Sequence, residues 1–325
     1  MSWFLVALIA YFLNAVAMTV DKTLLKKEGG FGNPIVYTFN IAALGSAILI
    51  LVIPFVFFIP SLSVILVSLA AGVVWVIGLV LMFKALAKDE ATRVTSAIGG
   101  LTPIFVIVLA IYLLAEKFSG NQALGCFLLI AGAFLMSLDF QEHGAASWLK
   151  KKLGLARDLA LPHIRKALLL ALPAAIFFGL SDVLTKIVFN NTSFWNGFVW
   201  VRIGSFLAVL ALLFSAKNRR DVAESFRKSS QGKKQSAEQK RVGLRFLFGQ
   251  ACGGVSALLK GYAISLGSVA LINAIAGVQY AIVFLLVVIL TKTAPKLLKE
   301  KLTREVVIQK VLAIVIIAAG LYLIK

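Results

Sequence analysis

The stretch SVILVSLAAGVVWVIGLVLMFKA, residues 63–85, carries Lys84 as its only charged side chain. An α-helix rises about 1.5 Å per residue and the hydrocarbon core of a bilayer is about 30 Å thick, so about 20 apolar residues suffice for one crossing. This stretch therefore predicts a transmembrane helix. Nine more apolar runs of similar length surround it, near residues 3–22, 34–58, 95–115, 120–138, 167–189, 195–215, 243–265, 268–290 and 306–324.

The composition of the whole chain agrees with this pattern. Sixty per cent of the 325 residues are apolar and the mean hydropathy is +0.96. The connections between the runs leave no segment large enough for a soluble domain. We therefore expect an all-α integral membrane protein with ten transmembrane helices.

Basic residues are distributed unevenly over the connections. The net charge is +19, and most of the 33 Lys and Arg residues lie in the odd-numbered connections. Basic connections stay cytoplasmic, so the pattern predicts a cell-membrane protein whose odd-numbered loops face the cytoplasm and whose two termini lie outside. A basic surface beside a membrane faces anionic lipid headgroups, which favours membrane lipids over nucleic acid as partners.

The chain also contains a weak internal repeat. Residues 10–22 (AYFLNAVAMTVDK) align with 174–186 (AAIFFGLSDVLTK), and residues 85–101 align with 263–279. Each repeat holds five predicted spans, an odd number, so the second repeat enters the membrane from the opposite side. This predicts two inverted five-helix repeats, the arrangement on which alternating access is commonly built.

These repeats set the expected domain boundaries. The first repeat covers residues 1–138 and the second covers residues 167–325. The basic linker between them, residues 139–166, fits either a short helix lying in the membrane interface or a solvated loop. Residues 217–242 are polar and rich in Lys, Arg, Ser and Gln, which predicts a disordered loop.

Four features between Ala97 and Met136 accompany the repeat, namely Pro103 in the fourth span, Glu116 after it, and Gly125 and Gly132 in the fifth. With them the chain resembles the drug/metabolite transporter superfamily, specifically its EamA family. The resemblance implies a central cavity between spans 1–4 and 6–9, with spans 5 and 10 at the periphery.

The second repeat departs from this pattern in two places. Ala281 stands where a counterpart of Pro103 would align, and residues 291–296 lengthen the ninth connection. Family members with ten helices are generally drawn with both termini in the cytoplasm, whereas the charge distribution places them outside. We follow the charges in this prediction.

Three ionisable residues lie deep in the predicted spans, where an unpaired charge is costly and therefore often functional. They are Asp182, Arg202 and Lys260. Asp182 and Arg202 lie at equal distances from the turn near Thr192, which predicts an Asp–Arg pair with Lys260 nearby. One interpretation is a substrate site that attracts anions or responds to protons, with Asp182 as the proton carrier. The alternative is a structural ion pair.

Seven uncharged residues in the spans are further candidates for substrate contact. Amide and phenol groups orient substrates by hydrogen bonds, and an indole ring offers a flat wall. Packing between helices is the alternative interpretation for all seven. They are Asn14, Tyr37, Asn40 and Trp75 in the first repeat and Asn273, Gln279 and Tyr280 in the second.

Pro103 lies inside a predicted span, where the missing backbone hydrogen bond favours a kink. We interpret it as a hinge, with simple packing as the alternative. The inventory of an enzyme is missing from the sequence: both histidines lie in the linker, no phosphate-binding loop has the required spacing, and no metal ligand set is readable. We therefore expect no cofactor, no metal and no enzymatic activity.

These observations favour a secondary active transporter of a small metabolite or drug-like solute. A flippase for a lipid intermediate is the first alternative, and a membrane scaffold or receptor without transport activity is the second. The expected partners are a small-molecule substrate and membrane lipids, and a homodimer remains open.

Overall fold

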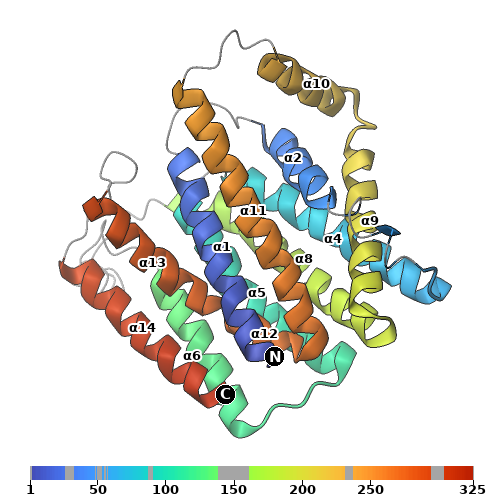
Figure 1. Cartoon of the computed structure of the whole chain (residues 1–325). Coiled ribbons are helices and arrows are strands. Elements are labelled where there is room, and N and C mark those ends of the chain that lie inside the picture. The colour runs from blue at the N-terminus through green and yellow to red at the C-terminus, as the bar shows by residue number, and fades with distance from the viewer. Residues whose placement is uncertain are drawn as a thin grey trace.

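The computed structural model describes residues 2–25, 33–47, 58–86, 91–137, 161–230, 237–293 and 304–324, with four isolated positions between 49 and 56. All regular secondary structure in these residues is helical (Figure 1). The helices are α1 (Trp3–Leu25), α2 (Pro34–Ser46), α4 (Leu62–Leu86), α5 (Ala91–Leu114), α6 (Gly120–Ser137), α8 (Leu161–Asn191), α9 (Phe194–Leu212), α10 (Ala216–Ser230), α11 (Ala237–Leu266), α12 (Val269–Ala274), α13 (Ala276–Thr293) and α14 (Arg304–Ile324).

Seven segments of the described residues are long and apolar enough to cross a membrane, which confirms an all-α membrane protein. The predicted number of ten spans is not confirmed. The apolar part of α6, Gly120–Met136, falls short of this length. The described part of α2 is 13 residues long, and α11 does not qualify. The seven segments are Trp3–Val20, Leu62–Ala85, Ala97–Leu114, Ala171–Asn191, Phe194–Leu212, Val269–Thr293 and Val307–Ile324.

Two predictions about the connections need correction. Disorder was expected at residues 217–242, yet α10 is a helix over Ala216–Ser230 and α11 already begins at Ala237. Charged residues dominate α10, but they leave Val222 for a buried face, and the Asp221 carboxylate accepts a hydrogen bond from Asn33 Nδ2 at 2.7 Å. Composition alone missed this amphipathic pattern.

The predicted linker lies mostly outside the described residues. Its last part, residues 161–166, is not a separate element, because α8 begins at Leu161 and continues through Pro173. The ninth predicted span, in contrast, is divided into two helices. Its short first part, α12, ends before Ile275, and α13 starts directly afterwards.

The helices from the two halves of the chain pack mainly against each other. The most extensive helix pairs are α1 with α11, α4 with α8, and α6 with α14, followed by α5 with α8 and α4 with α9. Figure 1 shows α6 and α14 side by side at one edge of the molecule, and α10 across the end of α9. The core therefore forms between the halves of the chain.

The close packing of α6 against α14 depends on Gly125 and Gly132, two of the residues on which the family resemblance was based. A Cβ on Gly125 would lie 2.7 Å from Ile324 Cγ1, and one on Gly132 would lie 2.6 Å from Ile317 Cγ1. A Cβ on Gly320 of α14 would lie 2.8 Å from Leu129 Cγ of α6. Small residues let membrane helices approach closely, which gives these glycines a structural role.

Contacts at one end of the molecule give the relative direction of the helices. Trp3, at the start of α1, lies against Gly267, which follows α11. Lys186, near the end of α8, donates a hydrogen bond to the Ile264 carbonyl of α11 at 2.9 Å. Thus α8 ends on the side of the molecule where α1 begins, and the two helices run in opposite directions.

Candidate functional site

The ionisable candidates are paired differently from the prediction. Lys260 Nζ of α11 lies 2.7 Å from Asp182 Oδ2 of α8 and donates a hydrogen bond to it. The Lys260 side chain is 29% exposed and that of Asp182 is 18% exposed. Asp182 lies near the middle of the span Ala171–Asn191. The two charges therefore compensate each other at mid-depth, between two helices that make few other contacts.

The predicted Asp182–Arg202 pair is wrong. Distance from the turn sets only the depth of a side chain, whereas the helical rotation decides which neighbour it faces. Asp182 faces α11, and Arg202 of α9 faces α4. The guanidinium carbon of Arg202 lies 5.3 Å from the centre of the Trp75 ring and 5.2 Å from that of Phe198.

Arg202 and Trp75 form the centre of a second cluster, which we call the arginine–aromatic cluster: Arg202, Trp75, Phe198 and Gly45. A Cβ on Gly45 of α2 would lie 3.6 Å from an Nη atom of Arg202. Arg202 and Trp75 are half-buried, whereas Phe198 is buried. No acidic side chain pairs with Arg202 among the residues that the structure describes. Cation–π contacts compensate only part of the cost of a charge at this depth.

A third polar contact joins the first and last thirds of the chain. Asn14 Nδ2 of α1 donates a hydrogen bond to Gln279 Oε1 of α13 at 2.7 Å, and Gln279 Nε2 contacts Met18 Sδ. Tyr11 lies one turn away and donates to the Ile272 carbonyl at 2.9 Å. Asn14 and Gln279 lie in different halves of the sequence, and no pattern there pairs them. Tyr11 was not among the predicted site residues, because in sequence it is an ordinary aromatic residue of an apolar span.

The other two candidates of the second half have structural contacts. Asn273 is buried and donates to the Val269 carbonyl of its own helix at 3.0 Å. The Tyr280 ring fills the space beside Gly99 of α5, because a Cβ on Gly99 would lie 1.3 Å from Tyr280 Oη. Tyr280 therefore holds α13 against α5, four residues from Pro103. That proline lies inside a continuous α5, and its role as a hinge remains a prediction.

The remaining candidates of the first half lie on α2. Tyr37 is buried in an apolar cluster, and its ring packs edge-to-face on Phe83 with the ring centres 4.5 Å apart. This contact supports the packing interpretation for Tyr37. Asn40 is half-buried on α2, the helix that packs against α9. The structure thus separates Tyr37 from the polar contacts described above.

Glu116 contacts the start of α12 and was not among the predicted site residues. Its Oε2 accepts a hydrogen bond from the Ser268 hydroxyl at 2.5 Å, and its Oε1 accepts one from the Val269 amide at 3.1 Å. A carboxylate at the start of a helix satisfies amides that have no partner within that helix. Glu116 therefore anchors the start of α12, and its place directly after a span was the available signal.

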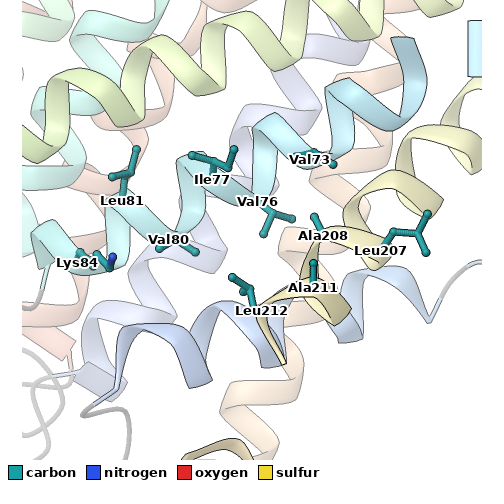
Figure 2. A pocket seen from close by; sticks show the side chains of 10 residues that line it. All are labelled: Val73, Val76, Ile77, Val80, Leu81, Lys84, Leu207, Ala208, Ala211 and Leu212. Carbon is teal, nitrogen blue, oxygen red and sulfur yellow. The ribbon is translucent and has the colours of Figure 1, made fainter. Parts of the chain in front are cut away.

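One groove lies between the helices that carry Trp75 and Arg202, although neither of these residues lines it. This groove of 560 Å³ runs between α4 and α9 and is lined by apolar side chains apart from Lys84 (Figure 2). Figure 2 shows Val76 and Val80 of α4 facing Ala208 and Leu212 of α9. Val73, Ile77 and Leu207 on its rim are exposed.

The comparisons with known proteins agree with the fold. A solved structure described only as "Crystal structure of protein" matches with a TM-score of 0.62 and 16% identity, over 99% of this chain and 95% of its own. This similarity shows the fold alone. No curated protein matches the chain. The model of the EamA-like transporter family matches residues 1–138. Residues 1–138 of this chain are therefore similar to the EamA-like transporter family.

Proposed function

We propose that the protein is a secondary active transporter of a small solute that works by alternating access between two inverted five-helix repeats. The similarity of residues 1–138 to a transporter family supports transport over enzymatic activity. The observation that carries the proposal is the placement of polar groups at mid-depth where the two halves meet. The Asn14–Gln279 and Arg202–Trp75 contacts each join one half of the chain to the other.

The packing of the helices supports the inverted arrangement. Exchanging the halves turns the pair α1–α11 into α8–α4 and the pair α5–α8 into α13–α1, and all four pairs are in contact. A buried serine bridges each of the first two. Ser256 donates to the Ala10 carbonyl at 2.7 Å, and Ser181 donates to the Ala71 carbonyl at 3.0 Å. The opposite directions of α1 and α8 fit the same exchange.

A reversible clamp across the two halves tests this mechanism. A Cβ on Gly253 of α11 would lie 3.7 Å from the Ala17 Cβ of α1, which suits a disulfide. In a background with Cys126 and Cys252 replaced by Ser, the double variant A17C/G253C should lose solute exchange in proteoliposomes when oxidised. A reductant should restore it. The solute is one selected by its stabilising effect on the wild-type protein in a thermal-shift screen.

The single variants A17C and G253C are the matched controls and should exchange solute under both conditions. If the fully cross-linked protein transports as fast as the reduced protein, the two halves do not rock against each other along α1 and α11. The alternating-access mechanism proposed here would then be wrong.

A lipid flippase is the second candidate, and the apolar groove between α4 and α9 is the observation that favours it. A lateral opening of this kind would accommodate an acyl chain. The same proteoliposomes distinguish the candidates when they contain a phospholipid with a fluorescent tail and a quencher outside. Protein-dependent quenching of the fluorescent lipids that start in the inner leaflet supports the flippase. The absence of both lipid and solute movement supports a scaffold or receptor.

Orientation in the membrane is part of the proposal. We infer that α10 faces the cytoplasm, because it belongs to the most basic connection. A cysteine at Ala223, exposed on α10, should be protected from a membrane-impermeant thiol reagent in intact cells, whereas one at exposed Ser61 should be labelled. Lysed cells provide the control, since both positions should then react. The reverse pattern in intact cells would place both termini in the cytoplasm.

A further inference from the structure

We propose that the arginine–aromatic cluster is the subsite for an anionic group of the transported solute, so that the substrate class is a small organic carboxylate or phosphate ester. This inference rests on the proposed transport function. It assigns Arg202 to direct contact with the solute and separates it from the Asp182–Lys260 pair.

Charge distinguishes Arg202 from the other ionisable candidates. Asp182 and Lys260 neutralise each other at 2.7 Å. Arg202 has two aromatic rings beside it and no acidic partner among the described residues. A guanidinium stays protonated in proteins, so Arg202 brings into the span a positive charge that no described acidic side chain balances. A bound anion would supply the missing charge.

The depth of Arg202 in the membrane makes its positive charge costly. Arg202 lies near the middle of the span Phe194–Leu212, and Trp75 lies near the middle of Leu62–Ala85. A side chain at this depth is too far from either end of its helix to reach the membrane surface readily. Basic residues placed in this way mark pathways for ions or substrates. Transporters of this architecture hold their substrates near the middle of the bilayer.

Access and shape favour an anion with a planar or tetrahedral oxygen group. Both Arg202 and Trp75 are half-buried, so part of each side chain is left open to contact. The absence of a side chain at Gly45 leaves room beside the guanidinium, 3.6 Å from where a Cβ would begin. The rings of Trp75 and Phe198 restrict the guanidinium plane and leave its N–H groups to bind two oxygens at once.

Binding of matched aromatic probes to the purified full-length protein tests this proposal. Benzoate and phenyl phosphate carry the two anionic groups, and benzamide is a neutral molecule of similar shape to benzoate. We expect the better of the two anions to bind the wild-type protein at least about ten-fold more tightly than benzamide, because an anion forms charge-assisted hydrogen bonds with Arg202 that a neutral amide cannot form. The stronger of the two anions identifies the ester or the carboxylate as the substrate class.

Variants locate the binding site. R202Q should weaken binding of that anion at least about ten-fold, and R202K should fall between R202Q and the wild type because an ammonium lacks the two-pronged geometry. R219Q removes an exposed positive charge on α10 and should leave binding unchanged. If R202Q does not fold, R202K and the wild-type comparison with benzamide decide the question.

Three results would overturn the anion subsite. They are equal binding of benzamide and the anions, wild-type affinity in R202Q, and no binding of either anion. Failure of the subsite is distinguishable from failure of the transport mechanism. Suppose that the A17C/G253C clamp stops the exchange of a neutral solute, and that neither benzoate nor phenyl phosphate inhibits this exchange. The transport mechanism would then be supported, and the anion site would be rejected. Anion binding without any effect of the clamp gives the reverse conclusion.

Discussion

D182N and K260Q should each lower the free energy of unfolding by about 3 kcal/mol, because each leaves an unpaired charge at mid-depth in the membrane. The double variant D182N/K260Q should be more stable than the sum of the single effects predicts. The swapped variant D182K/K260D should recover part of the stability. Thermal unfolding in one detergent measures the stability, and solute exchange in proteoliposomes measures the function.

The double-mutant cycle has a built-in control. Asp182 pairs with Lys260 at 2.7 Å, whereas Arg202 stacks on Trp75 and Phe198. The effects of D182N and R202Q should therefore add, because the two side chains have no shared partner. Coupling between Asp182 and Arg202, with additive effects for Asp182 and Lys260, would support the pairing expected from sequence and contradict the structure. A swapped variant that regains stability but not exchange would assign the pair to substrate or proton handling.

G72A should destabilise the protein by about 2–3 kcal/mol and impair transport, because it forces α4 and α9 apart. A Cβ on Gly72 would lie 2.3 Å from the Ser205 amide nitrogen and 2.4 Å from the Val201 carbonyl oxygen. Both contacts are to backbone, which cannot move aside as a side chain can. Arg202 and Trp75 lie on these two helices, so the arginine–aromatic cluster would be displaced as well.

G254A is the matched control for this change. Gly254 lies in α11 with nothing within 4 Å of the position of a Cβ. Alanine there should be neutral or stabilising by up to about 1 kcal/mol, because it favours the helix. Melting temperatures in the same detergent compare the two variants. A G72A protein that melts with the wild type would show that α4 and α9 are not held at the close distance described here.

The candidate residues were recognisable from the sequence, but their partners were not. Asn14 and Gln279 were both recognised as polar residues in apolar spans, and their hydrogen bond joins positions 265 residues apart. Their residue types made them candidates, but no local pattern pairs them. Tyr37 and Asn273 were recognised by the same criterion. The contacts described for them are a ring contact with Phe83 and a hydrogen bond within α12. Polarity in a span therefore selects residues that need a partner and does not reveal which partner they find.

Glu116 and α10 show two further limits. Glu116 stood out by its position after the fourth span, yet its role as the anchor of α12 depends on Ser268 lying beside it. The helix α10 was missed because its polar composition was taken to indicate disorder. A single buried residue, Val222, and the contact from Asn33 to Asp221 suffice to place it against the bundle.

The sequence by itself determined that this protein is an α-helical membrane protein, because apolar length and composition act locally along the chain. It also carries the similarity of residues 1–138 to a transporter family. It also determined which few polar side chains would be costly in a membrane. Only the tertiary structure decided that Lys260, and not Arg202, neutralises Asp182, and that Arg202 remains with Trp75. The physical reason is that helix rotation and packing across the two halves choose the partners, and close contacts such as Gly72 with Ser205 set that packing.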